Sequence, residues 1–362
     1  MIKRILKKYR QKRLWNKIRD SKNQSEQKYL VDNTYPLISD EELREIREAW
    51  PYMNLEKKDL TWSRIYKKEH GFSPYFIGVW QTHLLRQVFN PYEQLSSLEN
   101  KALCDVYFPE LPYPQAYVRR IQGIYYDKDM QVITEDKAIQ ILKTKHTYII
   151  KPAFGTKQGQ GVHKVTLTEE EKVNDEQIRQ SFSDQLSDFI AQEVLQQHPD
   201  VAALNPTSLN CCRVTTIYIN GKFGYSTIIK FGRKGSNVDN WHSSFLGGVT
   251  NDGKLLEYAY DYTLNRTDHT EFGLFFGGMQ LPCFVEMIQL VERSHKRLFP
   301  NCGMVGWDVV VDINNNIRVI EANVTTPGFV GEQYASGTFF EQFRDEINER
   351  MKQYYLNERN IS

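Results

Sequence analysis

The chain has 362 residues, a formal net charge of +1 and 40% hydrophobic residues, which is enough for two or three lobes with a substantial core. No apolar run approaches the roughly 20 residues that cross a bilayer, and no secretory apolar segment follows the N-terminal charges, so we expect a cytoplasmic protein. The five cysteines lack CxxC spacing and favour reduced thiols over a disulfide framework or zinc site, and without an HExxH pair a metalloprotease has no support.

The positive charge is concentrated in a basic N-terminal arm. Residues 1–28 hold eleven Lys or Arg against two Asp or Glu. Apolar residues of the arm do not form one stripe at about 100° per residue, so one continuous amphipathic helix is not predicted. A solvated arm or a docked short helix is the favoured interpretation, and weak contact with a membrane surface is the alternative; we expect no nucleic-acid partner.

Residues 29–100 are expected to form a mainly helical N-terminal lobe. A capping box at 39–42 predicts the start of a helix, and helical patterning with aromatic residues continues beyond it. Nothing in this lobe indicates chemistry. The proline-rich run at 108–114 marks a boundary, and strand and helix patterns then alternate in the region 101–146.

The first chemical signal is a lysine at the end of a strand. An apolar strand at 148–151 ends in Lys151, and a loop with Gly155, Gly159 and Gly161 follows. Glycine lets backbone N–H groups approach phosphates, and Lys151 would lie against their oxygens as a point charge. Neither GxxxxGK[ST] nor GxGxxG is present, which excludes a P-loop and a Rossmann fingerprint. A plain hairpin loop is an equal alternative on local evidence.

Two later segments carry weaker signals. The extended apolar segment at 189–195 offers backbone groups of the kind that pair with an adenine edge, and a buried connecting strand is the alternative. A strand at 210–219 carries Arg213 near its entry, where it would form a fork with a phosphate or carboxylate or else lie exposed on the surface. His242 and His269 are interpreted as ordinary polar residues rather than donors to a substrate.

The strongest local signal is an acidic hairpin. Two β-rich runs, 307–313 and 317–324, flank an Asn-rich turn. A two-residue turn on either pair of neighbouring asparagines places Asp308 opposite Glu321 or Asn323, and all three side chains share one face. Opposed carboxylates without a cation would repel, and hard oxygen ligands suit Mg²⁺. We therefore predict a magnesium site rather than a solvated hairpin.

The order of these parts resembles the ATP-grasp superfamily: lysine strand, glycine loop, hinge, Asn/Arg strand, acidic hairpin. The closer resemblance, over roughly residues 100–335, is to the sugar-transfer-associated ATP-grasp family. The motifs that carry it are Leu209-Asn210 to Arg213, Val238-Asp239-Asn240, Gly247-Gly248, Gly306-Trp307-Asp308 and Glu321-Ala322-Asn323. It implies an α+β fold in which two lobes clasp ATP, with the N-lobe and its flap at 147–200 and the C-lobe, with metal hairpin and terminal helix, at 201–362.

The resemblance implies roles for the residues around the nucleotide. Lys151 resembles the lysine that binds the α- and β-phosphates, and the loop Gly155–Gly161 resembles the mobile flap over them. Glu193 and Leu195 resemble the hinge whose backbone pairs with adenine. Asp200 is implied, by a looser alignment, as the acid that holds the ribose.

The resemblance also assigns the reacting end of the nucleotide. Asp308, Glu321 and Asn323 resemble the ligands of one or two Mg²⁺ ions, and Arg213 resembles a contact to the transferred phosphate. Cys211 departs from the family, whose members usually carry Thr there.

Three functions are compatible with this reading. The first is an ATP- and Mg²⁺-dependent carboxylate–amine ligase, whose substrate the resemblance implies to be an acidic sugar or an amino acid used in surface-polysaccharide assembly. The second is a kinase on the same scaffold that phosphorylates a hydroxyl. The third is a nucleotide-binding module without turnover, against which the joint presence of Lys151, Asp308, Glu321 and Asn323 argues.

Overall fold

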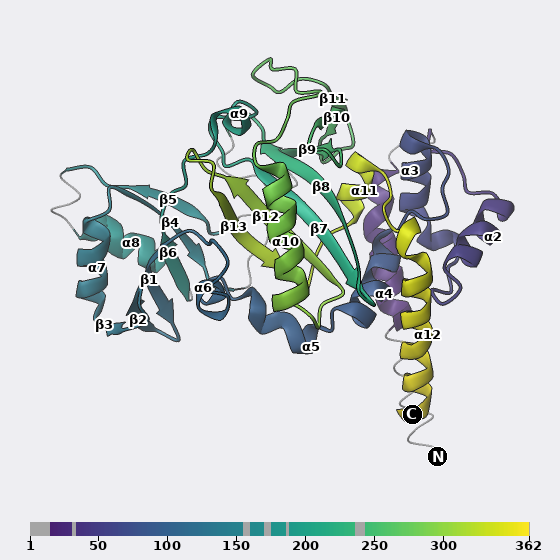
Figure 1. Ribbon diagram of the computed structural model, residues 1–362, viewed down its shortest axis with the longest axis horizontal. Coiled ribbons are helices and arrows are strands. Elements are labelled where there is room, and N and C mark those ends of the chain that lie inside the picture. The colour runs from purple at the N-terminus through teal and green to yellow at the C-terminus, as the bar shows by residue number, and fades with distance from the viewer. Residues whose placement is uncertain are drawn as a thin grey trace.

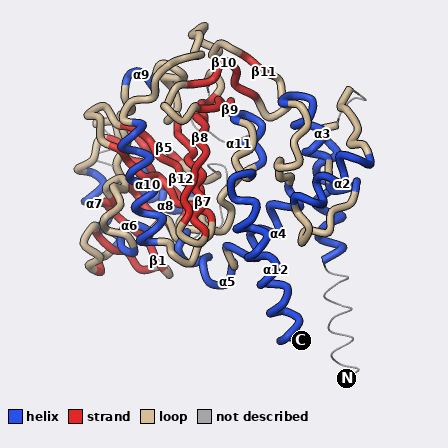
Figure 2. Tube along the Cα trace, turned by 45° about the vertical axis from the view of Figure 1, so that its right-hand side comes forward, coloured by secondary structure: helices blue, strands red, loops and turns tan. Residues whose placement is uncertain are grey.

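The computed structural model describes residues 15–30, 34–154, 160–169, 175–185, 188–235 and 243–361. The predictions for the arm before residue 15, for Gly155 and Gly159 and for His242 concern positions outside these ranges. A six-stranded sheet lies at one end of the molecule, a seven-stranded sheet in the middle and a helical layer at the other end (Figure 1). Figure 2 shows the strands gathered on one side of that layer.

The elements follow one another along the chain as follows. Residues 15–26 are helical, and the later helices are α2 Asp40–Ala49, α3 Thr61–His70, α4 Val79–Phe89, α5 Tyr92–Leu95, α6 Cys104–Tyr107, α7 Glu135–Lys143, α8 Glu176–Asp184, α9 Pro199–Ala202, α10 Phe284–Leu298, α11 Val330–Ser336 and α12 Arg344–Ile361. The strands are β1 Ala116–Ile121, β2 Ile124–Asp127, β3 Val132–Ile133, β4 Thr147–Pro152, β5 His163–Thr166, β6 Phe189–Gln192, β7 Cys211–Ile219, β8 Lys222–Gly232, β9 Ser244–Val249, β10 Leu255–Tyr260, β11 Arg266–Thr267, β12 Met304–Val311 and β13 Ile317–Asn323.

The helical N-terminal lobe is confirmed, and C-terminal helices complete it. The capping box of α2 forms as predicted: the Ser39 hydroxyl accepts from the Glu42 N–H at 3.1 Å, and the Glu42 carboxylate accepts from the Ser39 N–H at 2.7 Å. Leu43 and Ile46, on the buried face of α2, share a core with Ile347 and Met351 of α12. Residues more than 250 positions apart in the chain thus close one helical layer.

The six-stranded sheet has the order β3-β2-β1-β6-β4-β5, and each neighbouring pair is antiparallel. Strands from 101–146 and from 147–200 share this sheet, so the structure does not separate the two predicted regions. Tyr148 and Ile150 of β4 point into a core with α7 and α8, and the alternation of a strand sends Ile149 and Lys151 to the opposite face.

The seven-stranded sheet has the order β11-β10-β9-β8-β7-β12-β13. In β12, Trp307 and Val309 point into the core that α10 covers, and Asp308 between them points to the other face. Along β7, Arg213 shares that second face with Ile217, which packs against the helical layer. The helical layer therefore covers one end of this face and leaves the end with Arg213 and Asp308 open.

The turn between β12 and β13 differs from both predicted two-residue turns. Its loop holds three residues, 313–315, and Asn315 adopts the left-handed region with φ 62°. A shift in register between Asp308 and Val309 then offsets the extra residue, so Asp308 pairs with Glu321. The longer loop and the shift in register offset each other. Asp308 and Glu321 are therefore paired, as predicted for a two-residue turn on the first pair of asparagines.

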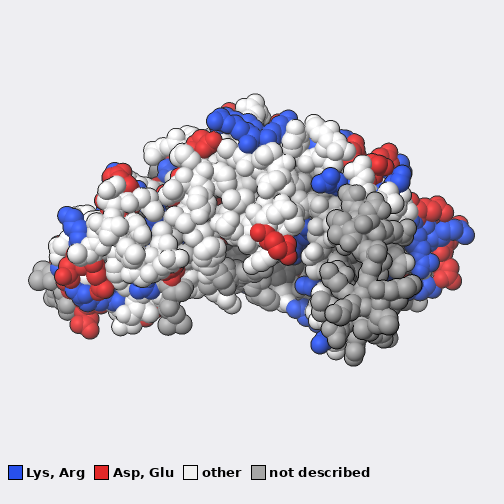
Figure 3. Space-filling view, turned by 90° about the horizontal axis from the view of Figure 1, so that it is seen from below, with Lys and Arg blue, Asp and Glu red and all other residues white. Residues whose placement is uncertain are grey.

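Within the described residues, none of the helices combines the length and the apolar character that crossing a bilayer requires. On the face shown in Figure 3, the described Lys and Arg side chains are interspersed with Asp and Glu and do not merge into one basic surface.

A stability prediction follows from Glu26, which is 2% exposed and whose carboxylate oxygens have no hydrogen-bond partner among the described residues. Burial, reinforced by Asp59 and opposed by Lys22, raises the pKa of Glu26 from 4.5 to about 8. The folded protein therefore keeps a proton that the unfolded chain loses near pH 4.5, and its stability falls as the pH rises between these two values. Glu26→Gln should remove this fall, which is on the order of a few kcal/mol.

Urea unfolding at pH 5 and pH 8 measures the effect. The exposed Glu45 of α2 gives the matched control, because Glu45→Gln should leave the fall intact. Equal falls in unaltered protein and Glu26→Gln would contradict the prediction.

Candidate active site

A cavity of 1180 Å³ lies where the open faces of the two sheets meet the helical layer. Its lining includes Lys151 from the six-stranded sheet, Asp308 and Arg213 from the seven-stranded sheet, and Trp62 and Arg86 from the helical layer. The cavity therefore gathers charged groups from parts of the chain that are distant in sequence.

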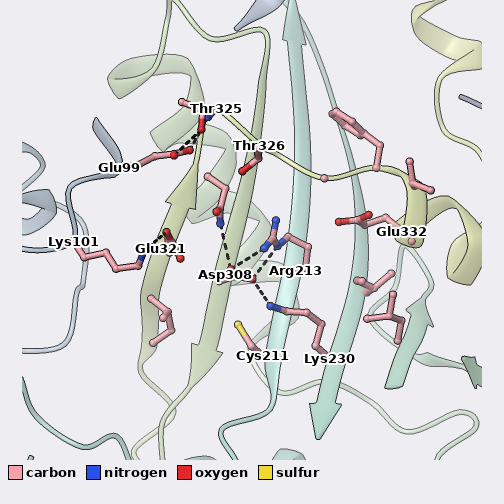
Figure 4. Close-up of a pocket in the computed structure, with 18 of the residues that line it drawn as sticks. Glu99, Lys101, Cys211, Arg213, Lys230, Asp308, Glu321, Thr325, Thr326 and Glu332 are labelled. Carbon is pink, nitrogen blue, oxygen red and sulfur yellow. Dashed lines mark hydrogen bonds and ion pairs between the residues drawn. The ribbon is translucent and has the colours of Figure 1, made fainter. Parts of the chain in front are cut away.

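A carboxylate held by two cations lies at the centre of this cavity (Figure 4). Arg213 contacts both oxygens of Asp308, Nε to Oδ1 and Nη2 to Oδ2, each at 2.9 Å, and Lys230 Nζ lies 2.9 Å from Oδ1. Asp308 is only 7% exposed. Burial alone would raise its pKa, but Arg213 and Lys230 outweigh burial and hold the pKa well below its ordinary value. The carboxylate is therefore ionised throughout the neutral range.

The other two predicted metal ligands lie beside Asp308. Glu321 forms an ion pair with Lys101 at 3.1 Å, and the Asn323 amide donates to Asp308 Oδ2 at 3.3 Å and to the Gly306 carbonyl at 3.2 Å. Figure 4 shows Glu321 on the neighbouring strand, turned toward Lys101. Strand alternation thus brings the three predicted side chains together on one face.

These side chains fit an open Mg²⁺ site, and they are too few to enclose a metal ion with protein ligands alone. The structure provides two carboxylates and an amide oxygen, and the described residues contain no group of three or more His, Cys, Asp or Glu that could hold a metal. Mg²⁺ usually takes one or two carboxylates and completes its octahedron with water and phosphate oxygens. Asp308, Glu321 and Asn323 would hold such an ion from one side only.

Lys151 faces the cavity from the opposite sheet. It is 7% exposed, and no described residue forms an ion pair or hydrogen bond with its ammonium group. Burial lowers its pKa, and the charge of Glu321 opposes that shift. At the end of the glycine loop, Gly161 has φ 73°, and a Cβ there would come 2.7 Å from the Pro152 ring. An ammonium group in this position, without a partner at ion-pair distance among the described residues, can accept an anion.

The predicted hinge borders the cavity through Glu193 and Leu195. The Glu193 side chain accepts from the Gln115 N–H at 2.7 Å and pairs with Arg318, and its own N–H donates to the Gln115 carbonyl at 2.9 Å. The Glu193 carbonyl and the Leu195 N–H bond to no other described backbone group. These are one acceptor and one donor of the kind that an adenine edge requires.

Asp200 is not brought to the cavity. It lies on α9 with an exposed side chain, and its backbone N–H donates to the His198 ring at 3.2 Å. The cavity lining among the described residues does not include it. The implied contact to ribose therefore has no geometric support.

Of the charged cavity residues that were not predicted from the sequence, four lie around the predicted metal ligands and the turn before α11, and only one of these four had a signal. The position of Lys230 could have been predicted from the alternation of side chains on β8. Its backbone pairs with Cys211, so its side chain lies on the same face of the sheet as Arg213. Lys101 and Glu99 come from a connecting segment whose position depends on the tertiary structure, and Glu332 lies in α11.

Two facing sheets with a lysine on one and an acidic hairpin on the other are the arrangement of an ATP-grasp protein. A family model described as sugar-transfer associated ATP-grasp matches residues 81–348. The chain belongs to the sugar-transfer-associated ATP-grasp family. The predicted fold and family are therefore confirmed.

Solved structures similar to this chain include proteins named as ligases or synthetases. D-alanyl-alanine synthetase A from Vibrio cholerae has 16% identity and TM-score 0.42 over 70% of this chain and 65% of that chain. The ATP-grasp ligase PsnB with minimal precursor, Mg and ADP has 14% identity and TM-score 0.38 over 72% and 61%, and the L-amino acid ligase from Bacillus licheniformis has 12% identity and TM-score 0.39 over 71% and 49%. The chain thus spans less than two-thirds of these structures. No curated protein matches it.

A prediction concerns the close contact behind Arg213. A Cβ on Gly306 would lie 2.1 Å from the Pro327 carbonyl oxygen and 2.8 Å from Arg213 Nη1. Since one neighbour is backbone, Gly306→Ala should lower the free energy of unfolding by about 2 kcal/mol or more. Urea denaturation measures the loss. Gly71→Ala, at φ 82° with open space around it, should lose only about 1 kcal/mol from backbone strain. A smaller loss at Gly306 than at Gly71 would contradict the prediction.

Proposed function

We propose that the protein is an ATP-dependent ligase that joins a carboxylate to an amine through an acyl phosphate. The observation that carries the proposal is one cavity in which Lys151, on one sheet, faces the Asp308–Glu321 pair on the other. Cations for the phosphates and oxygen ligands for their metal are thereby present on opposite walls.

The residues of the cavity would divide the work of phosphoryl transfer. Lys151 binds phosphate oxygens as a point charge, and Glu193 and Leu195 hold the adenine through the carbonyl and N–H described above. Arg213 orients the transferred phosphate and offsets its charge while the substrate carboxylate attacks in line. Bound Mg²⁺, held by Asp308, Glu321 and Asn323, would supply Lewis-acid stabilisation of the phosphate charge.

The amine then displaces phosphate from the acyl phosphate. Walls that exclude water protect this intermediate from hydrolysis. We infer from the family description that the carboxylate substrate is an acidic sugar or an amino acid used in surface-polysaccharide assembly. The need for ATP favours a cytoplasmic location.

Trapping with hydroxylamine tests the reaction. The protein is incubated with ATP, Mg²⁺ and pooled carboxylates, and hydroxylamine converts an acyl phosphate into a hydroxamate. A hydroxamate supports the ligase. A stable phosphorylated product would support the kinase instead, and no ADP from any pool would support a nucleotide-binding module.

Removal of a metal ligand should stop turnover. Glu321→Ala leaves Asp308 as the one carboxylate among the three predicted metal ligands, so we expect ADP release to fall to background with the unfolding midpoint nearly unchanged. Glu257→Ala, which removes an exposed strand carboxylate, is the control. Undiminished ADP release by Glu321→Ala would remove the metal assignment.

Removal of the buried lysine should weaken nucleotide binding. A hydrogen bond to a charged group contributes about 1.5–3 kcal/mol, so Lys151→Met should raise the Kd for ATP by about 10- to 100-fold in calorimetry. Lys164→Met, on the exposed part of the same sheet, should leave the Kd unchanged. Equal affinities for all three proteins would show that Lys151 does not contact phosphate.

A further inference from the structure

Glu332 differs from the other acids of the cavity. Glu321 pairs with Lys101 at 3.1 Å, Asp308 pairs with Arg213, and Glu99 accepts from the Val324 and Thr325 N–H groups at 2.8 and 2.6 Å. Glu332 is 8% exposed and lines the cavity, yet its carboxylate forms no ion pair or hydrogen bond with another described residue. It is a buried acid that lacks a counter-charge at ion-pair distance.

The chain holds Glu332 firmly in this position. Gly328 has φ 89°, and a Cβ there would lie 2.3 Å from Glu332 Oε1, so the carboxylate packs directly against the backbone of the preceding turn. The start of α11 is fixed by the Tyr66 hydroxyl, which donates to the Val330 carbonyl at 3.0 Å, and by Gln333, which accepts from the Ile77 N–H at 3.0 Å. The position of Glu332 is therefore fixed both by the turn before α11 and by the N-terminal helical layer.

Figure 4 shows Glu332 on the side of the Asp308–Arg213 pair that faces away from Glu321 and Lys101. In the proposed reaction, ATP enters from the side of Lys101 and Lys151, so the acyl phosphate forms with Glu332 on its far side. The wall there is apolar and consists of Ile228, Leu246, Val330, Trp62 and Val79. A second substrate would meet the intermediate from this side.

We propose that Glu332 binds the amine of the second substrate as its ammonium ion and takes the proton that must leave before nitrogen can attack. The proposal rests on the ligase function and names a residue for its second step. Burial raises the pKa of Glu332, while Arg213, a hydrogen bond from its own backbone N–H and Lys230 oppose the shift and Asp308 reinforces it. Tyr66 is a titratable group that faces it from α3. A base whose pKa is raised toward neutrality suits this transfer.

The step balances in atoms and charge. The ammonium nitrogen gives one proton to Glu332 and becomes a neutral amine. Its lone pair forms the C–N bond as the bond between the acyl carbon and the phosphate oxygen breaks, and the phosphate leaves with that electron pair. The second nitrogen proton passes to the phosphate, and Glu332 returns its own proton to solvent after the amide departs.

Among the described acids of the cavity, Glu26 also has neither an ion pair nor a hydrogen bond from another residue, and it does not fit this role. Both of its carboxylate oxygens are enclosed by protein, so an incoming amine cannot reach them. Glu332 is 8% exposed against 2% for Glu26, and it lines the cavity beside the Asp308–Arg213 pair. The amine is therefore assigned to Glu332.

The test compares two kinds of nucleophile in the second step, one that is uncharged at neutral pH and one that is protonated. Hydroxylamine is uncharged at neutral pH and needs no base, whereas amino acids and amino sugars arrive as ammonium ions. With a carboxylate that gives a hydroxamate in the unaltered protein, Glu332→Gln should form hydroxamate within about threefold of the normal rate. Its ligation of amines from a panel of amino acids and glucosamine should fall by about 100-fold or more.

Two further variants make the test decisive. Glu332→Asp keeps the carboxyl group and should recover part of the ligation rate, and Glu341→Gln removes an exposed acid ten residues before Met351 and should change neither rate. Unchanged ligation in Glu332→Gln, or an equal loss of hydroxamate and ligation, would overturn the role of Glu332 and leave the ligase standing. Absence of hydroxamate in the unaltered protein would overturn both.

Discussion

The site depends on one buried carboxylate that three neighbouring strands hold in place. Asp308 lies on β12, Arg213 on β7 and Lys230 on β8, and the cations meet both oxygens of the acid at 2.9 Å. A charge buried on a central strand is tolerated only where such partners offset its desolvation. Arg213 and Lys230 must lie on the same face of the seven-stranded sheet as Asp308. This part of the face is therefore charged, and it forms the floor of the cavity.

The opposing wall supplies positive charge that the floor does not neutralise. Lys151 has no ion-pair partner among the described residues, and Lys101 is paired with Glu321. In the proposed reaction, incoming phosphates would compete for both lysines, and Glu321 would then be available to a metal. In this scheme Lys101 exchanges a carboxylate partner for phosphate, and Glu321 exchanges a lysine for the metal. These two side chains would then be paired both in the empty protein and with nucleotide bound.

Local patterns predicted the side chains of the hairpin better than its turn. Strand alternation places Glu321 and Asn323 on one face, and Asp308 joins them because the shift in register beside it offsets the three-residue loop. The sequence predicted this grouping through a two-residue turn, so the result was right although the turn was wrong. The three-residue loop and the compensating shift in register depend on backbone conformations that many Asn-rich sequences could adopt. Lys101, Glu99 and Glu332 were missed for another reason: each reaches the cavity from a segment whose place is fixed by packing between distant parts of the chain, which no local period reveals.

The helical layer gives the cavity two chemically different ends. Beside β13 the acids all have partners, and in the proposed reaction this end holds the nucleotide and its metal. Beside α11 the walls are apolar and Glu332 keeps an unmatched charge, which favours a small cation over a phosphate. An acyl phosphate formed between the two ends would be shielded from water by Trp62 and Val79 and would be open to an amine from Glu332. The helices that carry no recognisable motif would then decide which amine is used, because they form the wall that it must pass.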